Sequence, residues 1–289
     1  MSCKPKKLGC KIKIPKIGIG TWRLHDSMKT EAALYKALEL GYRHLDTAYI
    51  YGNEVSIGKA LKRWFKKGHS RKELFITSKL PPFGLRDEDV SRYLCETLKR
   101  LQLQYIDLYL AHVPFGFFAS KSITLDHQNA GSWNWPSSLN TKNAIKWDYA
   151  TDHVEVWKAM EQEVDLKRTR HIGLSNFNIS QIENVLKHCR IKPACLQVEI
   201  HPYLQQKKLS VFCHNNDIVL VAYSPLGSMG NSVSDDFAPA MYDTTVEDIA
   251  RELGVTPAQV VLAYIMHLGA IPIPQTDDPN YLKDNFGCS

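Results

Sequence analysis

The stretch HLDTAYIYGNEVSIGKALKRW, from His44 to Trp64, places a brief apolar strand directly before an amphipathic helix. Ile57, Ala60, Leu61 and Trp64 lie at i, i+3, i+4 and i+7, which is the spacing of one stripe along a helix. The same alternation runs through the chain and predicts strands at residues 17–21, 44–46, 74–79, 106–111, 171–175, 194–199, 218–222 and 270–272. These segments are rich in Ile, Val and Leu without alternating, as is typical of strands buried on both faces.

Helix boundaries are marked further along the chain. Ser180, with Glu183 three residues later, forms a capping-box pattern and predicts the start of a helix. Gly254 is expected just after the end of another helix, and Thr256-Pro257 then opens the next one with a capping residue and a first-turn proline. Helices therefore fill the segments between the predicted strands.

Strands that alternate with helices predict a parallel sheet, which is either an open doubly wound sheet or a closed barrel. The length of 289 residues favours the barrel, because about 250 residues is typical of that fold. No Pro/Gly/Ser-rich linker divides the chain. We therefore expect an α/β protein with one (β/α)8 TIM-barrel domain over 1–289, an N-terminal β-hairpin at about 8–19, and a long functional loop at about 115–149 after the fourth strand.

Composition and charge exclude several other classes. The chain is 44% hydrophobic and 23% charged, which argues against disorder. Its net charge of +6 comes largely from lysine- and arginine-rich segments at 4–16 and 62–72. A solvated surface is the favoured interpretation of these charges and a phosphate- or nucleic-acid-binding patch the minor one, because no stacking aromatics alternate with them in a recognisable module. We therefore expect no nucleic-acid partner.

Cysteine usage and hydropathy bear on the compartment. The chain has seven cysteines, an odd number, and no C-x-x-C motif. This pattern disfavours a disulfide framework and a zinc site, and it favours a reducing compartment. No apolar run of about 18 residues and no secretory signal is visible. These features predict a cytoplasmic protein without a membrane or metal partner.

Ionisable residues follow three successive predicted strands. Asp46 ends the second strand, Tyr51 follows five residues later, Lys79 ends the third strand, and His112 follows the fourth. In a barrel these positions lie on one rim, where functional groups gather. Asp46 could hold Lys79 ionised, and Lys79 would lower the pKa of the phenol. Tyr51 could then protonate a developing alkoxide while His112 orients a carbonyl oxygen. Each residue alone also fits an ordinary structural role.

Longer motifs make the chain recognisable. It resembles the aldo-keto reductases from Pro15 to Phe286, through the segments 44–54, 76–79 and 107–114. On this resemblance Asp46, Tyr51, Lys79 and His112 form the catalytic tetrad. The resemblance implies hydride transfer from NAD(P)H to an aldehyde or ketone, with Tyr51 as the proton donor. A small-molecule carbonyl substrate and a monomeric protein are expected.

The resemblance also implies a nicotinamide site. Ser175, Asn176 and Gln197 are expected to contact the carboxamide, with Tyr223 stacked against the ring. The full implied cofactor set is Gly20, Thr21, Trp22, Ser175, Asn176, Gln197, Tyr223, Ser224, Leu226, Ser228, Gln275, Thr276, Tyr281, Asp284 and Asn285. The implied substrate set is Trp22, Tyr51, His112, Val113 and Phe115, with Phe118 or Trp133 as further candidates.

Two departures from the family pattern concern the cofactor and the chain end. Gln275 and Tyr281 stand where the family usually has the Lys and Arg that hold the adenosine 2′-phosphate, and Asp277 and Asp278 add negative charge. Because a phosphate prefers Lys and Arg and a ribose hydroxyl suits a carboxylate, we predict a weakened preference for NADP(H) and allow NAD(H). Relatives usually continue past the last helix, which implies a more open pocket here.

Two alternatives stay open at this stage. A catalytically weak nicotinamide-binding barrel could act as a sensor or subunit, which the altered phosphate segment favours and the intact tetrad disfavours. A barrel lyase or isomerase would instead turn over without nicotinamide.

Overall fold

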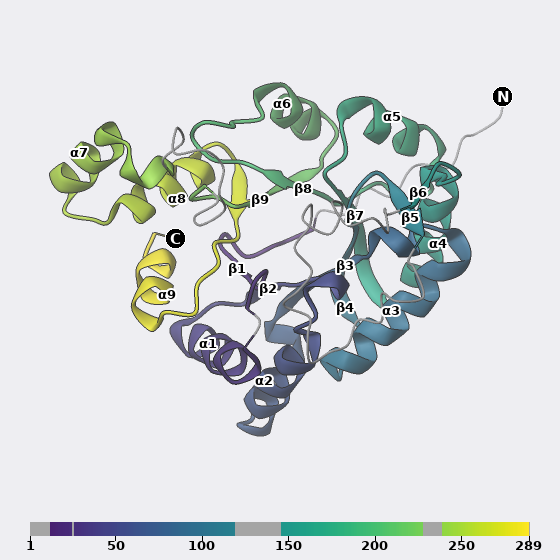
Figure 1. Cartoon of the computed structure of the whole chain (residues 1–289), viewed down its shortest axis with the longest axis horizontal. Coiled ribbons are helices and arrows are strands. Elements are labelled where there is room, and N and C mark those ends of the chain that lie inside the picture. The colour runs from purple at the N-terminus through teal and green to yellow at the C-terminus, as the bar shows by residue number, and fades with distance from the viewer. Residues whose placement is uncertain (1–11, 25, 119–145, 228–238, 289) are drawn as a thin grey trace.

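Eight parallel strands form one sheet that curls into a barrel (Figure 1). The computed structural model describes residues 12–24, 26–118, 146–227 and 239–288. Along the sheet the strands are β1 (Ile19–Gly20), β2 (His44–Asp46), β3 (Phe75–Leu80), β4 (Ile106–Ala111), β7 (Thr169–Ser175), β8 (Cys195–Glu199), β9 (Val219–Tyr223) and β10 (Ala270–Pro272). Neighbouring strands pair in parallel, from β1 with β2 to β9 with β10.

The seam between the first and last strands closes through backbone hydrogen bonds. Gly18 N donates to Pro272 O at 3.0 Å, and Gly20 N donates to Pro274 O at 2.9 Å. A Cβ on Gly20 would lie 2.7 Å from the carbonyl oxygen of Ile273, so only glycine allows this approach. The predicted (β/α)8 barrel is therefore confirmed, and the open doubly wound sheet is excluded.

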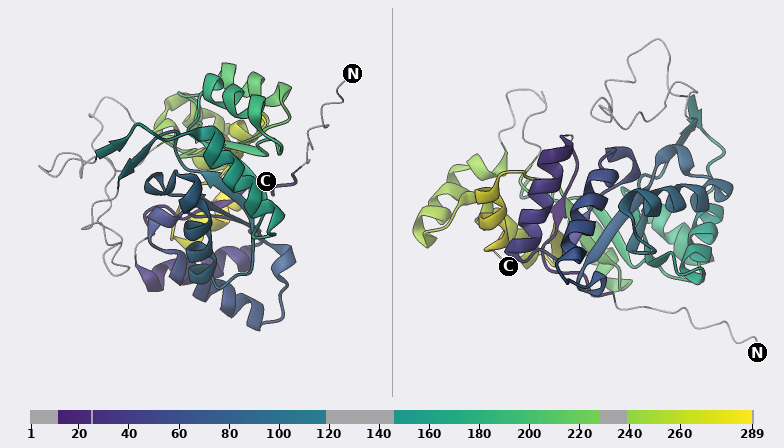
Figure 2. Two further views of the ribbon diagram at one scale, coloured as in Figure 1. Left: turned by 90° about the vertical axis from the view of Figure 1, so that its right-hand side faces the viewer. Right: turned by 90° about the horizontal axis from the view of Figure 1, so that it is seen from below.

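Helices surround the sheet on its outside (Figures 1 and 2). They are α1 (Ser27–Leu40), α2 (Glu54–Lys66), α3 (Asp87–Leu101), α4 (His153–Asp165), α5 (Ile179–His188), α6 (Lys207–Asn215), α7 (Thr244–Leu253), α8 (Pro257–His267) and α9 (Pro279–Phe286). Short 3-10 turns lie at η1 (Tyr49–Tyr51), η2 (Arg71–Glu73), η3 (Pro82–Gly84) and η6 (Ala240–Tyr242). In the described part of the chain, none of the helices has the length and apolar character needed to cross a bilayer.

Apolar side chains pack on both faces of the sheet. One layer joins the helices to the outer face, with Leu34, Leu38, Ile57 and Leu61 among its fully buried members. A second layer fills the barrel interior and contains Phe75, Leu108, Leu110, Cys195 and Val221. This double burial is the reason that the strands do not alternate between apolar and polar residues.

Helix caps agree with the sequence at two positions and differ at one. Gly254 ends α7 with a left-handed φ of 66°, and the Thr256 side chain accepts from Gln259 N at the start of α8, as predicted. The predicted cap at Ser180 is wrong. Helix α5 begins two residues earlier, where Asn178 accepts from Gln181 N and the Gln181 side chain accepts from Asn178 N. An equivalent capping box therefore outcompetes the one that starts at Ser180.

The predicted loop at about 115–149 contains regular structure at its base. Strands β5 (Gly116–Phe118) and β6 (Lys146–Asp148) pair antiparallel and project from the barrel (Figure 2). The rest of this loop lies outside the described residues. So does part of the N-terminal hairpin predicted at about 8–19, and residues 12–18 of that segment form no strand.

Candidate active site

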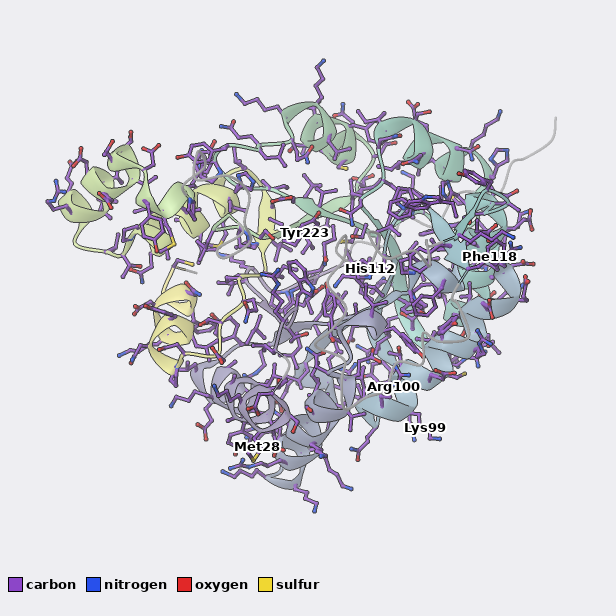
Figure 3. All side chains as sticks on the ribbon, viewed as in Figure 1. Met28, Lys99, Arg100, His112, Phe118 and Tyr223 are labelled. Carbon is purple, nitrogen blue, oxygen red and sulfur yellow. The ribbon has the colours of Figure 1, made fainter. Side chains whose placement is uncertain are left out.

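A cavity of about 530 Å³ opens at the carboxyl ends of the strands. Its lining comes from residues at or just after β1, β2, β4, β7, β8, β9 and β10. His112 and Tyr223, from opposite sides of the barrel, lie toward its middle, whereas Met28 and Lys99 lie at the periphery (Figure 3). This is the end of the barrel where the sequence predicted functional groups.

A buried ion pair lies at the base of the cavity. Lys79 is 0% exposed, and its Nζ donates to Asp46 Oδ1 at 2.5 Å, to Thr47 O at 2.9 Å and to the Tyr51 hydroxyl at 3.2 Å. Burial alone would lower the pKa of Lys79, but the Asp46 carboxylate and the Tyr51 hydroxyl together outweigh burial and raise that pKa above its usual value. Lys79 is therefore a fixed cation that touches the Tyr51 hydroxyl.

Tyr51 is presented to the cavity by the short turn η1 that follows β2. Gly52 ends this turn in the left-handed region, with a φ of 68°. Asn53 then ties the turn to the loop after β1, because its Nδ2 donates to Thr21 O at 2.7 Å and its Oδ1 accepts from Thr47 Oγ1 at 3.1 Å. These bonds tie the turn that carries Tyr51 to the segments that follow β1 and β2.

The direction of the Tyr51 pKa differs from the prediction. Burial raises the pKa of Tyr51 above its usual value, although the Lys79 cation acts in the opposite direction. The expected lowering by Lys79 is present, but the desolvation of the phenol, which depends on packing, is the larger effect. At neutral pH the Tyr51 hydroxyl is therefore protonated and can act as a proton donor.

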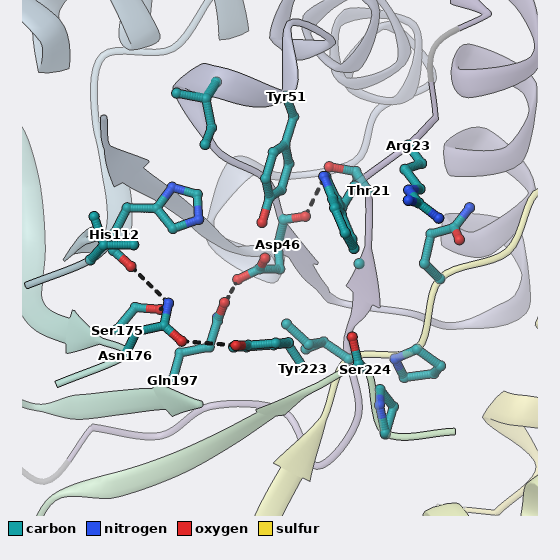
Figure 4. A pocket seen from close by; sticks show the side chains of 18 of the residues that line it. Thr21, Arg23, Asp46, Tyr51, His112, Ser175, Asn176, Gln197, Tyr223 and Ser224 are labelled. Atoms are coloured by element: carbon teal, nitrogen blue, oxygen red, sulfur yellow. Dashed lines mark hydrogen bonds between the residues drawn. The ribbon is translucent and has the colours of Figure 1, made fainter. Parts of the chain in front are cut away.

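His112 faces Tyr51 across the cavity (Figure 4), with ring centroids 5.7 Å apart and an angle of 74° between the planes. Burial and the nearby Lys79 charge lower the pKa of His112 well below its usual value. The imidazole is therefore neutral at pH 7, and one of its nitrogens carries a hydrogen that can be donated to a ligand.

Amide and hydroxyl groups form the opposite wall of the cavity (Figure 4). Asn176 Nδ2 donates to His112 O at 3.0 Å and to Ser175 Oγ at 3.1 Å, and Asn176 Oδ1 accepts from the Tyr223 hydroxyl at 2.8 Å. Gln197 Nε2 donates to Asp46 Oδ2 at 2.7 Å, which joins this wall to the ion pair. Burial raises the pKa of Tyr223 to about 12, so its hydroxyl remains a donor.

Comparison with known proteins places the chain in a family. The sequence pattern of the Aldo/keto reductase family matches residues 16–289. The chain belongs to this family.

Individual relatives agree. The reductase is 40% identical to "Aldose reductase" of Encephalitozoon cuniculi (strain GB-M1), over 99% of this chain and 89% of that protein. It is 39% identical to "Aldo-keto reductase family 1 member A1" of Xenopus tropicalis, over 95% of this chain and 80% of the relative. The solved structure of the aldose reductase from Schistosoma japonicum superposes with a TM-score of 0.84 at 38% identity, covering 99% of this chain and 87% of that one.

The family assignment confirms the predicted reaction class. The reductase is an NAD(P)H-dependent oxidoreductase of the kind that reduces carbonyl compounds. The relatives named above give no support to the sensor or subunit alternative, or to a lyase or isomerase.

Most of the predicted site residues of the reductase line the cavity. They are Gly20, Thr21, Trp22, Asp46, Tyr51, His112, Val113, Phe115, Ser175, Asn176, Gln197, Tyr223, Ser224, Leu226 and Gln275. Lys79 lies behind Asp46 and Tyr51 instead of in the lining. The predicted adenosine-end residues Thr276, Tyr281, Asp284 and Asn285 are also outside the lining, as is Phe118, which is 46% exposed. Ser228 and Trp133 lie outside the described residues.

The sequence analysis did not predict several residues that line the cavity. They are Arg23, Ile50, Pro225, Gly227, Ile273 and Pro274. All of them follow β1, β2, β9 or β10 within a few residues, so the strand-end rule could have found them. The sequence did not predict the backbone conformation of two lining residues. Arg23 and Ser224 adopt positive φ values of 67° and 46°, which are uncommon for residues of these types.

Proposed function

We propose that this reductase, acting as a monomer, reduces an aldehyde or ketone with Tyr51 as the proton donor. The observation that carries the proposal is the position of Lys79, whose buried ammonium donates to both Asp46 and the Tyr51 hydroxyl beneath the cavity. A proton leaving Tyr51 would create a phenolate next to a fixed cation. Preorganised charge of this kind stabilises a transition state without costly rearrangement.

The cavity fits a nicotinamide cofactor. Ser175, Asn176 and Gln197 would hold the carboxamide, and Tyr223 would support the ring. Because Gln197 Nε2 is already committed to Asp46, its Oε1 is the atom that would accept from the carboxamide amino group. When bound, the reduced nicotinamide supplies the hydride.

The residues of the chain divide the remaining work. The neutral His112 imidazole would donate a hydrogen bond to the substrate carbonyl oxygen and orient it toward the Tyr51 hydroxyl. Tyr51 would pass its proton to that oxygen as negative charge develops there. Asp46 would keep Lys79 oriented, and Lys79 would stabilise the phenolate.

The substrate end of the cavity is apolar. Trp22, Ile50, Val113 and Phe115 surround the Tyr51 and His112 side chains in the lining. Such a surface suits an uncharged aldehyde or ketone with a hydrophobic substituent. Val113 is a small side chain in the lining directly after His112, so we propose that a branched or aromatic substituent fits beside His112.

The adenosine end lacks the cations that hold a 2′-phosphate in the family pattern. Gln275 and Tyr281 are both exposed and uncharged where the family pattern has Lys and Arg. The Asp278 carboxylate accepts from Asn280 N and Tyr281 N at the start of α9, and Asp277 is exposed beside it. A dianionic phosphate next to these carboxylates would be repelled, whereas a ribose hydroxyl would not. We therefore propose that the reductase uses NADH as well as NADPH.

Carbonyl-dependent oxidation of each reduced nucleotide, followed by absorbance, tests the function and the cofactor preference together. We expect turnover with both nucleotides. The kcat/KM for NADPH divided by that for NADH should be far smaller than in a protein with Lys and Arg at positions 275 and 281. The double variant Gln275→Lys, Tyr281→Arg should lower KM for NADPH at least tenfold and leave KM for NADH nearly unchanged, since one charge-assisted phosphate contact contributes about 1.5–3 kcal/mol. A strong NADPH preference in the unaltered protein would refute the cofactor proposal, and turnover with neither nucleotide would refute the function.

A further inference from the structure

Helix α2 carries a dense run of positive charge on its outer face. Residues 59–72 contain seven Lys and Arg and no Asp or Glu. Lys59, Lys62, Arg63, Lys66 and Lys67 are all exposed. At 100° and 1.5 Å per residue these five side chains fall within an arc of about 140° and a length of about 12 Å. We name these five residues the α2 basic ridge.

An exposed aromatic ring stands at the C-terminal end of the ridge. The His69 imidazole lies flat on the Trp64 indole, with centroids 3.6 Å apart and 4° between the planes. Trp64 is only 4% exposed and packs edge-on against Tyr35 of α1, whereas the His69 side chain is 37% exposed. His69 is therefore the outermost ring of a buried aromatic cluster, and Trp64 covers one of its faces.

The same cluster holds part of the positive charge in place. The Arg63 guanidinium lies 4.0 Å from the centre of the Tyr35 ring, and Lys67 Nζ lies 5.1 Å from it. Arg43 approaches Trp64 from the end of α1, at 5.4 Å from its ring centre. Cation–π contacts restrict these long side chains, so less conformational entropy is lost when a ligand binds them.

We propose that the α2 basic ridge and the His69 ring bind single-stranded nucleic acid. The four lysines and Arg63 of the ridge contact successive phosphates, and one base stacks on the face of His69 that is turned away from Trp64. Bases of single strands commonly stack on aromatic rings, histidine included, and on arginine guanidinium planes. The sequence alone favoured a solvated surface, because no stacking aromatics alternate with these charges in a recognisable module. The fold stacks His69 on Trp64 and places Tyr35 of α1 against the same indole.

Other polyanions fit these observations less well. A duplex keeps its base faces stacked inside and offers none to His69. An acidic peptide can neutralise the ridge but has no flat base to stack on the ring. A membrane surface would favour exposed apolar side chains that enter the lipid, whereas Tyr35 and Trp64 are buried beneath the cations.

The proposed surface lies away from the reductase cavity. Helix α2 begins at Glu54, shortly after Tyr51 at the cavity, and runs back along the barrel toward the segment that precedes β3. Lys66, Lys67 and His69 therefore lie near the opposite end of the barrel from the active site. Carbonyl reduction should be independent of the ridge, which gives the binding test an internal control for folding.

Fluorescence anisotropy with a labelled oligoadenylate of about 15 nucleotides tests the proposal. With five phosphate contacts, affinity should fall about a hundredfold between roughly 50 and 200 mM salt. The test variant carries four substitutions, Lys59→Gln, Lys62→Gln, Lys66→Gln and Lys67→Gln. The matched control removes the same charge from exposed lysines of α5, α6 and α9, with Lys187→Gln, Lys207→Gln, Lys208→Gln and Lys283→Gln. We expect the test variant to lose most of the affinity and its salt dependence, and the control to lose a few-fold at most.

Stacking is tested by two substitutions of His69. His69→Ala should weaken binding of the single strand about tenfold, within the range expected for one stacked base, and His69→Phe should restore it. Unchanged carbonyl reduction in each variant shows that the barrel remains folded. The proposal would be overturned by equal losses of affinity in the two fourfold variants or by no effect of His69→Ala. It would also be overturned if an oligoadenylate–oligouridylate duplex, an oligo-aspartate or phosphatidylserine vesicles bound as tightly as the single strand.

Discussion

His44 makes the barrel sensitive to acid. It is 0% exposed on β2, two residues before Asp46, and its Nε2 lies 3.2 Å from Thr77 Oγ1. Burial lowers its pKa from 6.5 to about 4. Since the folded-state pKa is below the unfolded-state value, the stability contributed by neutral His44 is complete above about pH 6.5 and is lost as the pH falls toward 4.

The magnitude follows from the two pKa values. The difference between 6.5 and about 4, at about 1.36 kcal/mol per pKa unit, corresponds to a total of about 3 kcal/mol. At about pH 5 the protonation of His44 should already have lowered the free energy of unfolding by about 2 kcal/mol. This is a large part of the marginal stability of a typical domain.

Urea unfolding between about pH 8 and pH 4.5 measures this effect. His44→Gln removes the titrating group while keeping an amide nitrogen near Thr77. Between pH 8 and about pH 5, the free energy of unfolding of this variant should therefore fall by about 2 kcal/mol less than that of the unaltered protein. His188→Gln, at an exposed position on α5, should follow the unaltered protein. Parallel pH profiles for the unaltered protein and His44→Gln would refute the reasoning.

Three further predictions concern the site and the seam. Lys79→Met should lower kcat about 10²- to 10³-fold, because Lys79 would stabilise the phenolate in the proposed mechanism. Nucleotide affinity, measured by fluorescence quenching, should stay within a few-fold, because Lys79 does not line the cavity; a kcat within threefold of normal would contradict this. Gly20→Ala should destabilise the protein by about 1–3 kcal/mol in urea, because the new Cβ would meet Ile273 O at the barrel seam, and an unchanged midpoint would show that the seam can relax. Val113→Trp should raise KM for branched or aromatic ketones more than for small aldehydes, and an equal effect on both would place Val113 outside the substrate contact surface.

The barrel was largely predictable from the sequence. Three strands, 44–46, 106–111 and 270–272, have the predicted bounds. Runs of Ile, Val and Leu are conspicuous in sequence because both faces of each strand are buried. Helix ends were harder, since the Asn178 and Ser180 capping patterns overlap and only the folded helix selects between them.

The site was predictable where it depends on strand ends and not where it depends on three-dimensional surroundings. Asp46, Tyr51 and His112 line the cavity because each lies at or just after a strand end. The predicted direction of the Tyr51 pKa shift was wrong, because packing sets the balance between burial and the Lys79 charge. The position of Arg23 just after β1 was readable from the sequence, but its left-handed backbone and its contact with the Trp22 ring, 4.6 Å away, have no local sequence signal.

The most direct test of the central claim is the rate of hydride transfer in a single turnover of Tyr51→Phe. The variant is loaded with reduced nucleotide, mixed rapidly with an aldehyde, and compared with Tyr149→Phe, which removes a hydroxyl at a position that is 93% exposed. The account predicts nucleotide binding within a few-fold of normal in both variants and a rate that falls by about 10²- to 10⁴-fold in Tyr51→Phe alone. An unchanged rate in Tyr51→Phe would contradict the assignment of Tyr51 as the proton donor.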